Sequence, residues 1–264
     1  MSNTNYPREV FFFNPFGSTK RNNRIEVSDW PTCHIIALTF PFPPTSSDWS
    51  VFGIFHCVQY PDKFTVGRIE NGKKPYWTFH FFSNPYKFQV CSNTLAYHND
   101  RYYCLDMKGR LAIFFKDPDG IEMKVTWIDE STGIRFIGLK SRLLNRSFLA
   151  PGDDGEIFAA VISHRDPEVP VYKFDYLQTM WIPVENLRDT MLFVSEIASF
   201  VAKAPICSHM GNKIYFPKFY RKNGVFYSLH TKKYHLYNGR FVDEKPYRLD
   251  NMAMGTWIQP SCLV

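Results

Sequence analysis

The sequence predicts an all-β fold built from short antiparallel strands. Three observations point to it: runs of β-branched and aromatic residues recur along the 264 residues, turn residues separate these runs, and one strand–turn–strand unit occurs four times. Imperfect repetition of short strands is typical of a propeller or a sandwich, and not of alternating strands and helices. At about 40 to 45 residues per four-stranded blade, a propeller of this length has at most roughly six blades.

The first unit is a strand followed by a hairpin. Residues 49–58 (WSVFGIFHCV) are apolar on both faces, which predicts a strand that is covered on both sides. Residues 63–69 and 76–81 flank Asn71-Gly72, a pair that favours a tight hairpin turn.

Three more units follow the same plan. Their expected strands are 95–105, 110–115 and 123–127; then 155–162, 169–175 and 180–184; then 212–216, 224–229 and 233–237. Between the last two units lies the segment 190–205 (TMLFVSEIASFVAKAP), whose apolar residues fit one helical face as well as two strands.

Composition indicates a folded domain with a large core. The chain is 45% hydrophobic and 17% aromatic, it has no apolar run of the roughly 18 residues that a membrane span needs, and its first residues do not resemble a signal peptide. We therefore expect a cytoplasmic or nuclear protein, with import by an atypical signal left open. The six cysteines form no CxxC pair and are expected to be buried thiols.

The net charge of +6 raises the possibility of nucleic-acid binding. The basic residues are nevertheless dispersed in short groups, namely Lys20-Arg21 with Arg24, Arg221-Lys222 and Lys232-Lys233. Residues 231–241 (TKKYHLYNGRF) would suit base stacking, but they also describe a half-buried strand with Tyr234, Leu236 and Phe241 as packing residues. We expect no specific binding of nucleic acid and no binding to membranes.

No motif predicts an enzyme. The chain has no G-x-S-x-G, G-x-G-x-x-G, P-loop or H-E-x-x-H pattern, so catalytic, cofactor-binding and metal-binding residues are each expected to be none. Four weak candidates are interpreted structurally: Cys207 with His209 as coincidence, Asp117 with Asp119 and Asp153-Asp154-Gly155 as turns, and His56 and His80 as packing residues.

A series of spaced motifs carries a family resemblance. The motifs are 171–175 (VYKFD), 181–184 (WIPV), 186–189 (NLRD), 191–193 (MLF), 199–200 (SF), 211–216 (GNKIYF) and 224–229 (GVFYSL), with weaker matches at 13–16 (FNPF) and 155–157 (GEI). In this order they resemble the plant KIB-type F-box-associated domain, most strongly from about Phe148 onward. The resemblance implies a β-propeller, expected here over residues 10–264 after an N-terminal extension of residues 1–9.

The resemblance also implies details. It favours two strands, 191–194 and 199–201, over a helix, and it places Arg188 where the family commonly has Gly, which predicts a positive φ. Propeller-like sequence begins at Val10-Phe11-Phe12-Phe13 with no F-box-like helical segment before it, so no binding to a ubiquitin-ligase adaptor is expected. Residues 255–260 (GTWIQP) are a candidate strand to close the ring.

The resulting functional hypothesis is a non-enzymatic protein-interaction module. It resembles a ubiquitin-ligase substrate receptor and would hold an unidentified protein partner without delivering it to the ligase. The partner-binding residues are unknown at this level. The alternatives are a degenerate or truncated family member with little activity, and a weak nucleic-acid-binding β-domain.

Overall fold

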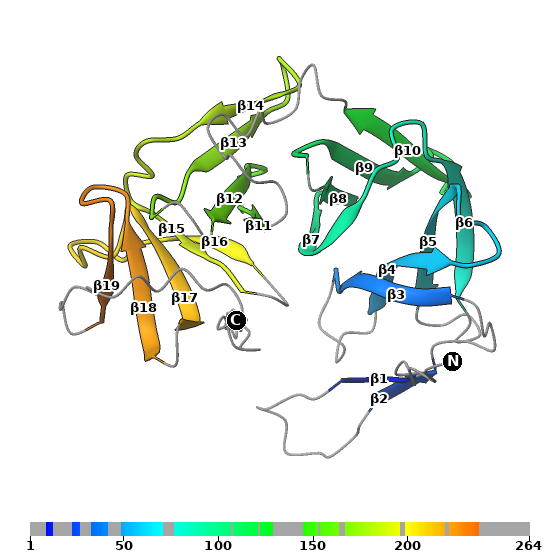
Figure 1. Cartoon of the computed structure of the whole chain (residues 1–264), viewed down its shortest axis with the longest axis horizontal. Coiled ribbons are helices and arrows are strands. Elements are labelled where there is room, and N and C mark those ends of the chain that lie inside the picture. The colour runs from blue at the N-terminus through cyan, green and yellow to red at the C-terminus, as the bar shows by residue number, and fades with distance from the viewer. Residues whose placement is uncertain are drawn as a thin grey trace. The chain divides into compact units, whose positions relative to one another are not determined.

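The computed structural model describes residues 9–12, 23–26, 33–41, 49–70, 77–106, 108–120, 122–128, 145–152, 154–163, 167–195, 199–219 and 222–237. These residues form nineteen strands and no helix, which confirms the all-β prediction (Figure 1). Within this part of the chain, therefore, no helix has the length and hydropathy that a membrane crossing needs.

The chain divides into two compact units, Met1–Phe88 and Gln89–Val264. In the first, β1 (Glu9–Phe12) pairs with β2 (Asn23–Glu26), and a separate antiparallel sheet has the order β3 (Cys33–Thr39), β4 (Ser50–Cys57), β5 (Lys63–Glu70), β6 (Thr78–Ser83). The expected strand and hairpin of the first repeat are thus confirmed, although their turn at 71–76 lies outside the described residues. The expected pattern omitted β3.

A pair of glycines makes room for the core of this sheet. Gly53 and Gly67 lie opposite each other on β4 and β5. A Cβ atom on Gly67 would come within 2.7 Å of the Phe55 ring and 2.8 Å of the Trp77 ring, so a side chain there would displace both rings. Phe55 uses the space to pack edge-on against Trp77, with 4.9 Å between ring centroids.

The expectation that every cysteine is a buried thiol is wrong for Cys33 and Cys57, which form a disulfide. Cys33 is directly opposite Cys57 in the β3–β4 ladder. The 24 residues between them carry no spacing signal, because strand register, and not sequence distance, brings the two sulfur atoms together. Cys104 is a buried free thiol and Cys207 an exposed one.

The second unit contains three sheets. In sheet order, the first two consist of β10 (Met123–Ile128), β9 (Leu111–Lys116), β8 (Arg101–Asp106), β7 (Val90–His98), and of β11 (Asn145–Pro151), β12 (Ile157–Ser163), β13 (Val171–Asp175), β14 (Met180–Pro183). The third consists of β16 (Phe200–Lys203), β15 (Thr190–Phe193), β17 (Lys213–Phe219), β18 (Lys222–Ser228), β19 (Lys233–Leu236). The pairs within the sheets are antiparallel except for β15 with β17, which are parallel.

Two details of the predicted pattern are settled here. Segment 190–205 forms the antiparallel strands β15 and β16, as the family resemblance implied, although 196–198 lie outside the described residues. Segment 95–105 was expected to be a single strand, and this is wrong. It turns at Asn99-Asp100, where both residues have positive φ (47° and 57°), as a two-residue hairpin turn between β7 and β8 requires.

The sheet β11–β14 is covered on both faces. Phe158, Ala160 and Ile162 of β12 belong to a core shared with the sheet β15–β19, whereas Ile157 and Ala159 belong to a core shared with the sheet β7–β10. Because both faces are buried, β12 is an almost continuous apolar run and not an alternating one. Successive sheets stacked face to face are the arrangement of propeller blades.

Candidate functional site

A pocket of about 450 Å³ opens on the sheet β11–β14, at the end that carries the β13–β14 hairpin. Three short segments line it: Asp154, Gly155 and Glu156 ahead of β12, residues 173–177 of β13 and the hairpin tip, and Ile182 and Val184 at β14. Its lining residues include no His, Cys or Ser.

The hairpin tip is held in place by Asp175. Its Oδ1 atom accepts hydrogen bonds from the backbone N–H groups of Leu177 (2.8 Å) and Gln178 (3.1 Å), and Thr179 closes the loop with a φ of 51°. An Asp that bonds the backbone two residues ahead favours a turn, so the position of Asp175 at the end of β13 dictates where the hairpin bends.

Tyr176 anchors the same tip to the core. Its ring packs edge-on against Phe174, with 5.1 Å between centroids, and its hydroxyl donates a hydrogen bond to the Tyr103 hydroxyl at 3.3 Å. Burial, followed by the hydrogen bond with Tyr103, raises the pKa of the Tyr176 phenol, so this side chain is neutral at physiological pH. The tip is therefore a positioned element.

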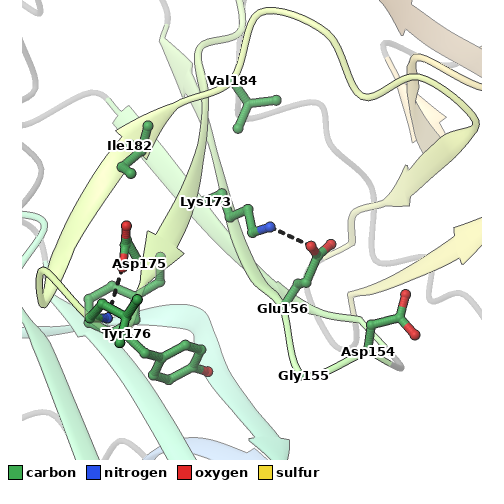
Figure 2. A pocket seen from close by; sticks show the side chains of 10 residues that line it. Asp154, Gly155, Glu156, Lys173, Asp175, Tyr176, Ile182 and Val184 are labelled. Carbon is green, nitrogen blue, oxygen red and sulfur yellow. Dashed lines mark hydrogen bonds and ion pairs between the residues drawn. The ribbon is translucent and has the colours of Figure 1, made fainter.

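The charged side chains of the pocket are unevenly matched. Lys173 forms an ion pair with Glu156, and Figure 2 shows the two side chains pointing toward each other, with Asp154 beside Gly155. Asp154 is exposed and makes no ion pair with any described residue. Three carboxylates thus face a single ammonium group.

Exposed apolar side chains surround the charged group. Leu177 at the hairpin tip is 96% exposed, and Tyr176, Met180 and Ile182 are 41%, 38% and 39% exposed. Single exposed apolar residues are ordinary, but a group of them on an anchored hairpin marks a surface able to bind another molecule.

A second exposed apolar loop connects β16 to β17. Ile206 is 96% exposed on it, and Met210 is 38% exposed. The Tyr215 hydroxyl donates to the Met210 carbonyl at 2.8 Å, which fixes one side of the loop. Cys207 and His209 also lie here, both exposed, and no hydrogen bond links them in the described part of the chain, in agreement with coincidental spacing.

The other residues singled out in the sequence have structural roles. Asp117 accepts from the Glu122 N–H at 3.1 Å in the β9–β10 turn, which confirms the turn interpretation. Asp154 lines the pocket, a role the sequence did not reveal, while Asp153 lies outside the described residues. His56 is exposed on β4 and His80 stacks on Phe82, and the described residues contain no cluster of three metal-ligating side chains.

The basic groups are separated from one another. Lys232 makes an ion pair with Glu168, whereas Lys20, Arg21 and Arg221 lie outside the described residues. Segment 231–237 contains β19 with Tyr234 buried at 3% exposure, so the strand interpretation holds there, and Phe241 lies outside the description.

Comparison with known proteins identifies the family. The model described as KIB1-4 beta-propeller matches residues 1–238. The chain belongs to the KIB1-4 β-propeller family. The sheets of this KIB1-4 chain are therefore propeller blades, which confirms the predicted fold class. No curated protein sequence matches it.

Among solved structures, the KIB1-4 chain is similar to a GH43 β-1,3-galactosidase, BT0265, at 16% identity and a TM-score of 0.36. The alignment covers 64% of this chain and 34% of the galactosidase chain. A likeness this low carries no argument about activity. The predicted domain boundary at residue 10 and the expected cellular compartment stay predictions.

Proposed function

We propose that this KIB1-4 propeller is a non-enzymatic protein-interaction module, related in role to the substrate-receptor domains of plant F-box proteins. The observation that carries the proposal is the pair of anchored loops in the second unit, each of which presents an apolar side chain at 96% exposure, Leu177 and Ile206. Rigid scaffolds that display variable loops concentrate binding residues on those loops.

The chemistry of the pocket supports binding over catalysis. Its only ammonium group, on Lys173, is engaged by Glu156, and no nucleophile lies beside a histidine base among its lining residues. An acyl- or phosphoryl-transfer site would need such a constellation. We place the partner among proteins because the exposed apolar groups extend beyond the pocket along the hairpin.

The test is quantitative affinity purification of the tagged chain from cells that express it. The wild type is compared with a Leu177→Ser/Ile206→Ser double variant, whose folding is verified by circular dichroism and thermal melting. We expect a set of proteins that is enriched with the wild type and lost with the double variant. No enriched protein, or an unchanged set, would contradict the proposal.

The same purification measures whether a ubiquitin-ligase adaptor accompanies the partner. The expectation that no adaptor binds stays a prediction until that measurement is made.

A further inference from the structure

We propose that the pocket on β11–β14 binds a basic segment of the partner protein, taking an apolar side chain together with a neighbouring Lys or Arg. This inference rests on the proposed function and adds the chemistry of what is bound. It assigns the apolar contact to Leu177 and Ile182 and the cation contact to Asp154 and Asp175.

The apolar contact is available without rearrangement. Leu177 is 96% exposed and Ile182 is 39% exposed, and both line the pocket. Asp175 and Tyr176 hold the hairpin, so an incoming side chain would meet a preformed surface. Preorganisation of this kind lowers the entropic cost of binding.

The charge contact follows from what the pocket already uses. Glu156 is occupied by Lys173, and Asp175 uses Oδ1 for the two hairpin N–H groups. Asp154 and the Oδ2 atom of Asp175 accept no hydrogen bond from any described residue, so both are available to a cation.

The nearest other cation is already engaged. Arg101 acts electrostatically on Tyr176, and its guanidinium lies over the Phe115 ring at 5.7 Å from the centroid. The pocket is therefore locally negative on a chain whose net charge is +6, and charge complementarity selects a basic segment.

Recognition through side chains suits this position better than addition of a strand. β14 is an edge strand of the β11–β14 sheet, but it has four residues and ends in Pro183, which has no N–H to donate. The pocket volume of about 450 Å³ also lies at the small end of ligand sites, which span roughly 300–1,000 Å³. Such a volume suits one or two side chains of a partner.

The probe is a phage-displayed library of random dodecapeptides, selected on the full-length chain. Selected peptides are synthesised and their affinities measured by fluorescence anisotropy at two salt concentrations. We expect the enriched peptides to combine Lys or Arg with an adjacent aliphatic or aromatic residue, and their affinity to fall as salt rises.

Matched variants locate the binding. Leu177→Ser is expected to weaken peptide binding about tenfold, because a buried Leu side chain is lost, and Asp154→Lys about fivefold, because an ion pair becomes a repulsion. The controls Ile206→Ser and Asp119→Lys change an equally exposed apolar residue and an exposed turn carboxylate outside the pocket, and should leave affinity unchanged.

Three results would overturn the inference: enrichment of acidic or uncharged peptides, enrichment of none, or equal effects of the pocket variants and their controls. Equal affinity for spermidine alone would assign the pocket to a small cation instead. If affinity purification captures partners that depend on Ile206 and not on Leu177 or Asp154, the proposed function stands and this inference fails. If it captures none, the proposed function itself fails.

Discussion

Arg188 shows how a single residue can be held in a costly conformation. Its φ is 55°, in the left-handed region, as its place in the family pattern predicted. Its N–H donates to Asn186 Oδ1 at 2.7 Å, and a Cβ on Gly211 would come within 2.5 Å of the Arg188 carbonyl oxygen. The backbone around Arg188 is therefore confined from both sides.

We predict that Arg188→Gly raises the free energy of unfolding by about 0.5–1 kcal/mol. Relief of a left-handed conformation is worth roughly 1–2 kcal/mol, and the added flexibility of Gly in the unfolded chain offsets part of it. Urea denaturation measures the change. Glu185→Gly, at a neighbouring residue outside the positive-φ set, should instead lower stability; equal effects of both variants would refute the strain argument.

His235 is expected to make stability depend on pH. It is buried, stacks on Phe226 at 5.0 Å between centroids, and has Nε2 at 2.8 Å from Thr231 Oγ1. Burial, followed by the charges of Lys213 and Lys233, lowers the pKa of its imidazole.

A lowered pKa means that the unfolded chain binds the proton more tightly than the folded chain. Stability should be full above the unfolded pKa of about 6.5 and decrease as pH falls through the folded value. We predict that His235→Phe, which keeps a stacking ring, flattens the slope of unfolding free energy between about pH 7.5 and 5. His56→Gln, at an exposed position on β4, serves as the control; a slope unchanged by His235→Phe would contradict the assignment.

The β8–β9 hairpin is an element organised around one buried ion pair. Asp106 is fully buried and Arg110 is 3% exposed. Asp106 Oδ1 accepts from the Lys108 and Arg110 backbone N–H groups at 2.8 and 2.9 Å, and Oδ2 accepts from Arg110 Nε at 2.7 Å. One carboxylate therefore shapes the turn and compensates a buried charge.

Asp106→Ala should destabilise the protein by about 3–5 kcal/mol, because it leaves the Arg110 charge buried without its carboxylate. Denaturant unfolding followed by tryptophan fluorescence measures the loss. Asp119→Ala, exposed in the next turn, should change stability by less than about 0.5 kcal/mol. A small effect of Asp106→Ala would show that the hairpin does not depend on this pair.

The tryptophans of two outer strands differ in what they stabilise. The sequence suggested that Trp127 and Trp181 are both buried, but only Trp181 is, at 4% exposure and 5.2 Å from the Phe174 ring between centroids. Trp127 on β10 is half-buried and lies against Phe114 at 6.2 Å.

Trp181→Ala is therefore expected to cost about 3–5 kcal/mol, and Trp127→Ala clearly less, since a smaller area is removed from water. Thermal melting of the two variants side by side gives the order. Trp127→Ala as the more destabilising variant would mean that the core is misplaced.

At the scale of the whole molecule, the positive charge is spread out. The net charge of +6 is distributed over strands and turns of different sheets, and several cations pair with carboxylates, among them Lys124 with Glu122, Lys203 with Asp189 and Lys232 with Glu168. Nucleic-acid binding needs cations gathered along one surface to displace the counterions of several phosphates.

We predict that a labelled 20-base-pair DNA duplex binds with a dissociation constant weaker than about 1 µM at 150 mM salt, and that the affinity falls with added salt. Fluorescence anisotropy with two unrelated duplex sequences checks it. Submicromolar binding that prefers one sequence would favour a nucleic-acid function over the proposed one.

The sequence by itself determined what depends on near neighbours in the chain. The all-β class, most strands of the second unit, the Asp175 turn and the left-handed position of Arg188 follow from side-chain alternation, turn chemistry and spaced motifs. These signals act over a few residues, so they are visible before any contact is known.

The tertiary structure alone decided what depends on register and stacking. The Cys33–Cys57 disulfide, the parallel pairing of β15 with β17, and the pocket that joins Asp154 to Leu177 bring together residues whose separation in sequence carries no signal. The sequence missed β3 and β11, and it merged β7 with β8. Strand partners are chosen by burial against neighbouring sheets, a long-range free energy that local periodicity does not contain.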